Sequence, residues 1–479
     1  MSPTETKTGL TAVILAAGEG TRMKSALPKV LHPLCGRPMI DFVVQAALDA
    51  GADDAVVVIG HRRDEVAAHL ATSFGDRVRT AVQEEQNGTG HAVRCALPAF
   101  ADGAQVAVLL YGDTPLVRSA DLRKLVAARH GGDHELAMLT CRVDDPTGYG
   151  RILRGPDGAI AAVREQRDCS DAEQAIDEVN PGMYVAKMSF LEEALAGLQP
   201  NNDQGELYLT DIVAAAATRG AVAHHSAPAG TVVGINDRVQ LAAAEDEMYQ
   251  DIADRLRVGG ATIRRSARIE VGVTIEPEAV IEHGVVLRGA THISTGARID
   301  VGCVLTDVTV APAAYVKPYS VGLQSTIGEG AQVGPFSHLR PGSQLDAEVH
   351  VGNFVETKQT HLRRGAKANH LAYLGDGDIG ERANVGAGTI FCNYDGFQKH
   401  QTIIGKDAFI GSDSQTVAPV TVGDGAYVAT GTTVTRDVPA DGLAIARIRQ
   451  DNKEGYAPRL KARLKAAAAR AKAKQSPSS

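Results

Sequence analysis

An aliphatic residue recurs at every sixth position through much of the second half of this chain. The series begins at Ile263 and holds for eight positions in succession, the last being Leu305. The same spacing returns over residues 327–351 and, with interruptions, over residues 379–434, where Thr416 fills one aliphatic slot. Neither a helix nor an alternating strand has a period of six, whereas a parallel β-helix of hexapeptides does. The repeat therefore predicts a β-helix in which every sixth side chain points inward and stacks on its copy one coil away.

Up to about residue 240 a different pattern predicts short buried strands that alternate with helices. Strands are expected at TAVILAAG, DAVVVIG, QVAVLLYGD and HELAMLTC, and helices at MIDFVVQAALDA and SADLRKLVAARH. This alternation indicates a mostly parallel sheet covered by helices, and such sheets bind ligands beyond the carboxyl ends of their strands. Residues 237–258 are expected to form one longer helix that connects the two parts.

Length and composition narrow the class of protein. A chain of 479 residues is too long for one core, and its formal net charge of −8 gives no reason to expect nucleic-acid binding. No run of about 20 apolar residues is present, so no membrane span is expected. The six scattered cysteines form no C-x-x-C pair, which favours reduced thiols in the cytoplasm over a metal cluster. The basic, Ala-rich residues 451–479 are expected to form a solvated, partly disordered tail.

The first chemical motif is LAAGEGTRMKSALPK, which follows the first expected strand. Its Gly-rich turn lets backbone N–H groups approach phosphate oxygens, and Arg22 and Lys29 can neutralise charge during phosphoryl transfer. The third glycine of the Rossmann pattern is missing, and the P-loop pattern does not fit. Asp113, in YGDTPL, follows a later strand and is a candidate magnesium ligand, although a plain turn residue is the alternative.

The complete string, L-x-x-G-x-G-T-R-M followed by P-K, resembles the nucleotidyltransferases that load sugar-1-phosphates onto nucleoside triphosphates. QEEQNGTGHA, GYGRI, REQRD, EVNPGMY and GIND resemble further segments of that family. The resemblance implies in-line attack on the α-phosphorus without a covalent intermediate, with Arg22 and Lys29 as catalytic residues and Mg²⁺ held by Asp113 and Asn236. It also implies sugar-nucleotide contacts at Leu15, Ala16, Ala17, Gly18, Lys29, Gln83, Gly88, Thr89, Tyr111, Gly112, Asp113, Gly150, Glu165, Asn180 and Asn236.

A β-helix alone can be a spacer, but polar motifs between residues 340 and 447 suggest chemistry. LRPG, FVETKQ, NHLAYLGD, NVGAGTIFCNYDGFQKHQTIIG, FIGSDS and AIARIR resemble the hexapeptide acyltransferases, whose β-helix is left-handed. The resemblance implies that His370 is the general base for attack of a sugar amine on a thioester. It implies glucosamine-1-phosphate contacts at Arg340, Lys358, Tyr373 and Asn384, and acetyl-CoA contacts at Ala387, Asn393, Tyr394, Ser412, Thr430 and Arg447. Thr430 departs from the family's common Ala, and Glu356 either orients the imidazole or binds the substrate ammonium.

The interrupted stretch from Asn384 to Gly405 is expected to carry a loop. Val385 and Ile404 lie nineteen residues apart, one more than a coil of three hexapeptides. We therefore expect a short excursion that displays Asn393 and Tyr394 outward toward a neighbouring subunit, with Cys392 only a neighbour.

The pairing of both motif sets resembles the family of bifunctional uridylyltransferases and N-acetyltransferases of UDP-N-acetylglucosamine synthesis. The implied fold is α/β, a Rossmann-like nucleotidyltransferase domain followed by a left-handed parallel β-helix. The implied domains are 1–236, the linker helix 237–258, the β-helix 259–450 and the tail 451–479. A homotrimer with acetyl-transfer sites between subunits is expected, with UTP, sugar-1-phosphates and acetyl-CoA as its small-molecule substrates. Two alternatives remain open: a monofunctional nucleotidyltransferase whose β-helix binds effectors, and a non-catalytic scaffold.

Overall fold

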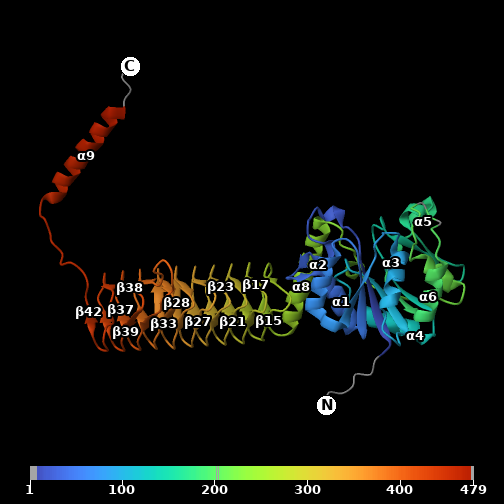
Figure 1. Ribbon diagram of the computed structural model, residues 1–479, viewed down its shortest axis with the longest axis horizontal. Helices are drawn as coiled ribbons and strands as arrows, with labels where there is room; N and C mark the ends of the chain where they lie inside the picture. The colour runs from blue at the N-terminus through green and yellow to red at the C-terminus, as the bar shows by residue number, and fades with distance from the viewer. Residues whose placement is uncertain (1–7, 201, 203, 476–479) are drawn as a thin grey trace, which may run out of the picture. The chain divides into compact units, whose positions relative to one another are not determined.

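The computed structural model describes residues 8–200, 202 and 204–475 (Figure 1). It divides into two compact units. The first contains Met1–Gly259 and Arg268–Val273, and the second contains Gly260–Ala267 and Thr274–Ser479. In the described part of the chain, no helix is both long enough and apolar enough to cross a membrane.

The first unit is built on a mixed sheet that contains all four predicted strands, three of them in its parallel half and the fourth as β7 (Leu136–Arg142) in the other half. β5 (Val78–Val82), β4 (Asp54–Ile59), β1 (Leu10–Ala16) and β6 (Val106–Tyr111) lie side by side and run parallel. Beyond them, β11 (Tyr184–Lys187) is antiparallel to both β6 and β7. The sheet continues through β10 (Glu178–Asn180), β8 (Gly150–Arg154) and β9 (Ile160–Arg164), while β12 (Ala223–Ser226) pairs with β7. The expectation of a mostly parallel sheet thus holds for one half only.

Helices cover both faces of this sheet because successive side chains of a strand point to opposite sides. Ala12 and Ile14 of β1 belong to one buried cluster with residues of α1 (Met39–Asp49), α2 (Arg63–Phe74) and α4 (Ser119–Gly131). Val13 belongs to the opposite cluster, with residues of α3 (Thr89–Ala96), α6 (Met188–Gly197) and α7 (Asp211–Ala217). The short α5 (Asp171–Gln174) and the long α8 (Arg238–Val258) complete the unit, and the Asp237 carboxylate caps α8 by accepting from two N–H groups.

The second unit is the predicted β-helix, whose coils stack in single file (Figure 1). It has three parallel sheets. Within this unit, the first runs from β13 (Thr262–Ile263) to β42 (Leu443–Ala444), the second from β17 (Val286–Arg288) to β41 (Thr433–Val434), and the third from β15 (Thr274–Ile275) to β39 (Val420–Val422). Ile263, Ile281 and Ile299 pair in succession and are nearly inaccessible to solvent, which confirms the predicted inward column. Thr416 is likewise buried, where its hydroxyl bonds to that of Thr402.

The prediction of one extra residue in the interrupted coil is wrong. β34 (Asn384–Val385) pairs with β37 (Phe409–Ile410), so this coil runs over 25 positions from Val385 to Ile410. The following coil, from Ile410 to Val428, takes 18. The predicted length was wrong because the segment from Val385 to Ile404 passes over only two of the three faces of the β-helix and so is less than one full coil. The insertion is residues 393–401, between β35 (Ile390–Cys392) and β36 (Thr402–Ile404).

The basic tail contains one helix, α9 (Tyr456–Gln475). The final residues of the expected disordered end, 476–479, lie outside the described residues.

Two candidate active sites

A cavity of about 260 Å³ lies at the carboxyl ends of β1 and β6. Eight residues expected to contact a sugar nucleotide line it: Leu15, Ala17, Gly18, Gln83, Gly88, Thr89, Tyr111 and Asp113. Three further lining residues were not predicted: Gln86, Ala92 and Glu206. Ala16 packs into the core instead, and Gly112 donates its N–H to the Leu15 carbonyl.

The predicted catalytic and metal-binding residues lie together beside this cavity. The Lys29 Nζ is 2.5 Å from Oδ2 of Asp113 and 2.8 Å from Oδ1 of Asn236. Arg22 donates to the same Asn236 oxygen at 2.8 Å. A Cβ at Gly20 would come within 2.6 Å of the Lys29 Cβ, so this glycine lets the loop fold closely onto Lys29. The sequence motif therefore brings two cations to one carboxylate and one amide oxygen.

Asp113 and Asn236 form a donor set that fits a hard divalent cation. The Ile235 N–H donates to the Asp113 carbonyl at 2.8 Å, which joins the two segments, and the Asn236 N–H donates to Gln240 on α8. Mg²⁺ prefers oxygen ligands and commonly takes only one or two from protein, with phosphates and water completing the shell. The pair is therefore suited to a magnesium–phosphate complex.

Next to the cavity, Asn180 at the end of β10 is fixed by the protein on both ends of its amide. Its Nδ2 donates to the Tyr184 hydroxyl at 2.7 Å, and its Oδ1 accepts from the Gly182 N–H at 3.0 Å. Tyr184 is fully buried, which raises the pKa of its hydroxyl well above the usual range. A Cβ at Gly182 would overlap the Tyr111 ring, so this glycine lets the Asn180 turn pack against the cavity wall.

Glu165, another residue expected to contact the sugar, lies near the Tyr111 side of the site. Burial raises the pKa of its carboxyl group, and the Thr210 hydroxyl donates to it at 3.1 Å. A Cβ at Gly150 would lie within 4 Å of the same carboxylate. Thr210 belongs to a segment that folds over the predicted base-recognition segment, where the Gly90 N–H donates to the Leu207 carbonyl at 2.8 Å. The sequence reasoning missed this segment, which also supplies Glu206.

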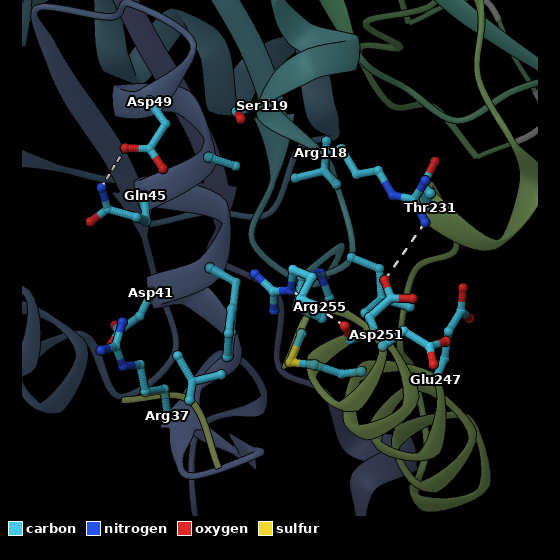
Figure 2. Close-up of a pocket in the computed structure, with 18 of the residues that line it drawn as sticks. Arg37, Asp41, Gln45, Asp49, Arg118, Ser119, Thr231, Glu247, Asp251 and Arg255 are labelled. Atoms are coloured by element: carbon cyan, nitrogen blue, oxygen red, sulfur yellow. Dashed lines mark hydrogen bonds and ion pairs between the residues drawn. The ribbon is translucent and has the colours of Figure 1, made fainter. Parts of the chain in front are cut away.

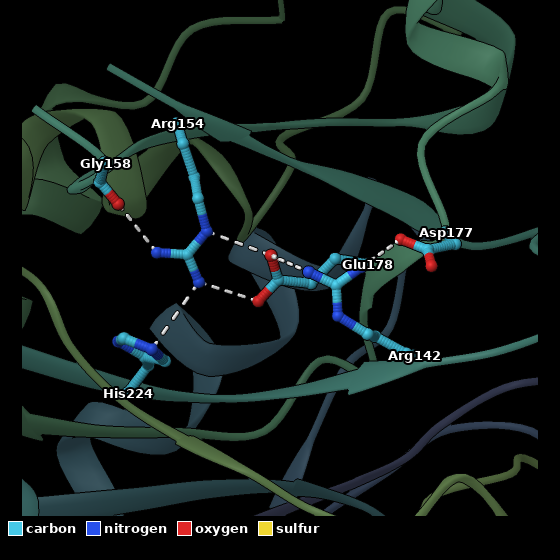
Figure 3. Close-up of polar contacts among 6 residues, drawn as sticks. All are labelled: Arg142, Arg154, Gly158, Asp177, Glu178 and His224. Carbon is cyan, nitrogen blue, oxygen red and sulfur yellow. Dashed lines mark hydrogen bonds and ion pairs between the residues drawn. The ribbon is translucent and has the colours of Figure 1, made fainter. Parts of the chain in front are cut away.

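An ion-pair network holds the first residue of β10 (Figure 3). Glu178, two residues before Asn180, accepts from Nε and Nη2 of Arg154 at 2.9 and 2.7 Å. This paired hydrogen bond holds the pKa of Glu178 below its usual range. Arg154 also lies 3.5 Å from His224, whose pKa is lowered by burial.

A larger cavity, of about 750 Å³, lies between α1, α8 and the start of α4 (Figure 2). Its walls carry both acidic and basic side chains, including Asp41, Arg118 and Asp251. None of the predicted site residues lines this cavity. The predicted uridylyl-transfer residues therefore lie at the smaller of the two cavities.

In the β-helix, His370 lies on a corner that also carries three predicted coenzyme contacts. The corner follows the sheet containing β28 (His350–Asn353), β31 (Lys367–His370), β34 and β37. The equivalent positions in the next three coils are Ala387, Ser412 and Thr430. At each position, the N–H of the residue that follows donates to a backbone carbonyl of the preceding coil. Arg447 donates to the Thr430 carbonyl and so lies at the far end of this line. We call His370, Ala387, Ser412 and Thr430 the corner column.

The partner of the His370 ring is Asn353, which was not predicted. Nδ1 of His370 lies 2.9 Å from the Asn353 Oδ1, one coil earlier. An amide oxygen only accepts, so Nδ1 is the donor in this contact, and in the neutral imidazole Nε2 then carries the lone pair. Glu356, expected either to orient the imidazole or to bind the substrate ammonium, accepts from Arg340 at 2.8 Å in this structure.

The residues expected to bind the sugar phosphate lie on two faces of the β-helix. Arg340 follows β26 (His338–Leu339), Lys358 lies on β29 (Glu356–Lys358) and Tyr373 on β32 (Tyr373–Gly375), all in the second sheet. Asn384 begins β34, in the first sheet. The corner column lies between these two faces.

The insertion, residues 393–401, displays only one of the two residues expected to face outward. Asn393 is buried at 4% exposure and donates to the Asp376 carboxylate, so it anchors the loop. Tyr394 is 57% exposed and lies under the Lys399 ammonium, 4.4 Å from its ring centroid. Inside the loop, Asp395 accepts from two N–H groups, chiefly that of Gln398, which hold the pKa of its carboxyl group far below the usual range.

Comparison with known proteins places both halves in one family. Residues 12–181 match the model of the MobA-like NTP transferase domain, and residues 401–436 match a hexapeptide repeat of succinyl-transferase. The chain is 65% identical over 466 residues to the bifunctional protein GlmU of Sorangium cellulosum, covering 96% of this chain and 98% of that one. The chain belongs to the bifunctional GlmU family. It is 47% identical to the Trichlorobacter lovleyi member (93% and 97% covered) and 45% identical to that of Corynebacterium efficiens (97% of each).

Membership of the GlmU family makes this chain a bifunctional enzyme of UDP-N-acetylglucosamine synthesis. One activity transfers an acetyl group from acetyl-CoA to glucosamine-1-phosphate. The other transfers a uridylyl group from UTP to N-acetylglucosamine-1-phosphate and releases pyrophosphate. The two sites described above are the candidates for these reactions.

Proposed function

We propose that uridylyl transfer takes place at the carboxyl ends of β1 and β6. The observation that carries this assignment is the convergence of Arg22, Lys29, Asp113 and Asn236 beside the cavity. Gln83 and the Gly88 turn would face the base, while Glu165 and Asn180 would hold the sugar. Lys29 can exchange its contact with Asp113 for a phosphate oxygen, and Arg22 can neutralise charge as pyrophosphate leaves. Mg²⁺ held by Asp113 and Asn236 would polarise the phosphates and hold them in line.

We assign acetyl transfer to the corner column. Nε2 of His370, freed by the hydrogen bond at Nδ1, accepts a proton from the sugar amine as the amine attacks the thioester. Arg340 and Lys358 supply positive charge for the sugar phosphate, and Tyr373 supplies a hydroxyl. Coenzyme A would extend from His370 along Ala387, Ser412 and Thr430 to Arg447.

The remaining expectations belong to the same proposal. Acetylation precedes uridylyl transfer, because the acetylated sugar is the uridylyl acceptor. We place the protein in the cytoplasm, where UTP and acetyl-CoA are available, and infer a homotrimer built on the β-helix. The proposed domain limits are 1–236, 237–258, 259–450 and 451–479.

Two isosteric variants separate the two activities. Asp113→Asn removes the carboxylate charge needed for the metal, so pyrophosphate release should fall at least a hundredfold while thiol release from acetyl-CoA stays within twofold. His370→Asn should produce the reverse pattern, since it removes the base. The two rates are measured on the same protein, with UTP plus N-acetylglucosamine-1-phosphate in one assay and acetyl-CoA plus glucosamine-1-phosphate in the other. Retention of thiol release by His370→Asn would reject the base assignment, and retention of pyrophosphate release by Asp113→Asn would reject the metal assignment.

A further inference from the structure

The first turn of α8 contacts two segments of the proposed uridylyl-transfer site. The side-chain oxygen of Gln240 accepts from the backbone N–H of Asn236, the proposed metal ligand, at 2.7 Å. Nε of Arg238 donates to the Met23 carbonyl at 3.2 Å, and Met23 directly follows Arg22, the proposed catalytic residue. Neither Gln240 nor Arg238 is among the residues that line the cavity. One helix turn thus holds the backbone of two segments that are far apart in the sequence.

The contact of Gln240 differs from an ordinary helix cap. The Asp237 carboxylate accepts from the N–H groups of Val239 and Gln240, as an N-cap residue does. In a capping box, the side chain of the third helical residue returns to the N–H of the cap itself. Here the Gln240 side chain reaches one residue further back, to Asn236. The cap therefore restrains the proposed metal ligand as well as the end of the helix.

The Asn236 side chain is also restrained, at its amide. Its Nδ2 donates to the Gly234 carbonyl at 3.2 Å, which leaves Oδ1 to accept from Lys29 at 2.8 Å. The same Lys29 ammonium lies 2.5 Å from Oδ2 of Asp113, so the two proposed ligand oxygens face one point. Because Gln240 holds the backbone from which this side chain starts, the direction of Oδ1 depends on α8.

Arg238 is placed where helix stability alone does not favour it. The N-terminal end of a helix carries partial positive charge, which disfavours a cation at the first helical residue. Arg238 is the first residue of α8, and its side chain is exposed. The hydrogen bond to the Met23 carbonyl gives this guanidinium a role outside its own helix.

Arg238 contacts a short turn that carries Arg22. The turn, Thr21–Met23, lies between two residues with positive φ, Gly20 at 64° and Lys24 at 48°. The Met23 side chain is 1% exposed and anchors the turn in the protein, whereas Arg22 is exposed and reaches across to Asn236. The place of the Arg22 guanidinium therefore depends on the backbone of the turn, and Arg238 holds that backbone at the next residue.

We propose that Gln240 and Arg238 are positioning residues for uridylyl transfer, and that through them the first turn of α8 holds Asn236 and Arg22 in register. Gln240 acts through Asn236, and Arg238 acts through Arg22. These two site residues are 214 positions apart in the sequence, and their side chains meet at 2.8 Å. The inference rests on the proposed uridylyl-transfer site.

The role of Gln240 is tested by metal binding, without turnover. Mn²⁺, which suits the same oxygen ligands as Mg²⁺, is titrated with UTP present and no sugar phosphate, and the free ion is followed by electron paramagnetic resonance. Gln240→Ala should weaken Mn²⁺ binding about tenfold, as loss of a residue that orients a metal ligand does. Gln240→Glu keeps an acceptor oxygen and should restore binding to within about twofold. Gln250→Ala is the matched control on α8, since Gln250 donates to Asp254 at 3.0 Å, and should leave binding unchanged.

The role of Arg238 is tested by a double-mutant cycle with Arg22. Arg238→Ala should lower kcat for uridylyl transfer about tenfold in the wild-type background, because it releases the turn that carries Arg22. In the Arg22→Ala background the same change should cost less than about twofold, since the residue through which Arg238 acts is already gone. Equal losses in the two backgrounds would reject this role.

Asp113→Asn separates failure of the inference from failure of the proposed site. Retention of Mn²⁺ binding by Asp113→Asn would reject the metal site itself. Loss of binding in Asp113→Asn with none in Gln240→Ala would reject only the positioning role, and a lower melting temperature of Gln240→Ala would then identify Gln240 as a helix cap and nothing more. If Gln240→Ala does not fold, Gln240→Leu, which keeps the bulk but has no acceptor, takes its place with the same expected loss.

Discussion

The imidazole of His370 contacts the side-chain amide of Asn353, whereas the nearby carboxylate of Glu356 contacts Arg340. Asn353 fixes the ring through Nδ1, while Glu356 pairs with Arg340 on the face assigned to the sugar phosphate. Glu356 was considered for the orienting role because its string, FVETKQ, is a recognisable motif. Asn353 lies immediately before that string and contacts His370 only because one coil brings residues 17 apart into register.

Asn353→Ala and Glu356→Gln should therefore differ in kinetics. Without Asn353 the ring is free to rotate and to change tautomer, so kcat for acetyl transfer should fall about tenfold with little change in KM. Glu356→Gln weakens the hold on Arg340 and should raise the KM for glucosamine-1-phosphate while kcat stays within about twofold. Steady-state thiol-release kinetics on both variants measure this split. A fall in kcat for Glu356→Gln with none for Asn353→Ala would restore the original orienting hypothesis.

Among the elements, β10 connects the sugar side of the first site to an ion-pair network. Asn180 and Glu178 lie on this one short strand, and Glu178 is held by Arg154 from β8 (Figure 3). The string EVNPGMY made Asn180 predictable, because the resemblance to known sugar-binding segments includes it. Glu178, Arg154 and the covering segment with Thr210 were not predictable, since their contacts join segments far apart in the sequence.

Glu178→Gln should lower stability in a pH-dependent manner. The folded pKa of Glu178 lies below its unfolded value of about 4.5, so its stabilisation is fully present above pH 4.5 and disappears as pH falls through the folded pKa. The loss near pH 7 should be about 2 kcal/mol, less than for a fully buried pair because the Arg154 side chain is 30% exposed. Thermal unfolding at several pH values measures this, with the difference from wild type shrinking below pH 4.5. A difference that stays constant down to pH 3 would contradict the assignment.

The β-helix shows most clearly which elements a sequence can reveal. Its core was predictable because inward positions repeat at a fixed spacing and demand aliphatic side chains, as at Ile281 and Ile299. The insertion was recognised, but its length was not, because counting between two aliphatic residues does not tell which faces they occupy. Asn393 was misplaced for a related reason: burial at the base of a loop depends on a partner, Asp376, supplied by the preceding coil.

At the scale of the whole molecule, the first compact unit recruits a short segment from beyond α8. Arg268–Val273 belongs to it, although residues 260–267 belong to the second unit. The Val271 N–H donates to the Cys35 carbonyl at 3.0 Å, and the Arg268 guanidinium lies 5.3 Å from the Tyr249 ring centroid. Burial and two nearby carboxylates raise the pKa of the Cys35 thiol to about 12. Hexapeptide spacing assigns this segment to the β-helix and gives no sign of its second role.

A shortened chain that ends at Val273 should consequently be more stable than one that ends at Gly259. One backbone hydrogen bond and one cation–π contact together contribute about 2 kcal/mol, which corresponds to roughly 5 °C in a unit of this size. Calorimetry on the two shortened chains measures the difference, and uridylyl transfer should be similar for both at 25 °C. Equal melting temperatures would show that the segment adds nothing to the first unit.

The corner column also sets a scale of length. Its four positions, from His370 to Thr430, are spaced by one coil each, so three intervals of about 4.8 Å separate the base from the last contact, about 14 Å in all. In the proposed site, the β-helix therefore fixes the distance from the base to each contact of the acyl donor in steps of one coil. Changing one contact alters how tightly the donor is held, but only the gain or loss of an entire coil changes how far its reactive end reaches.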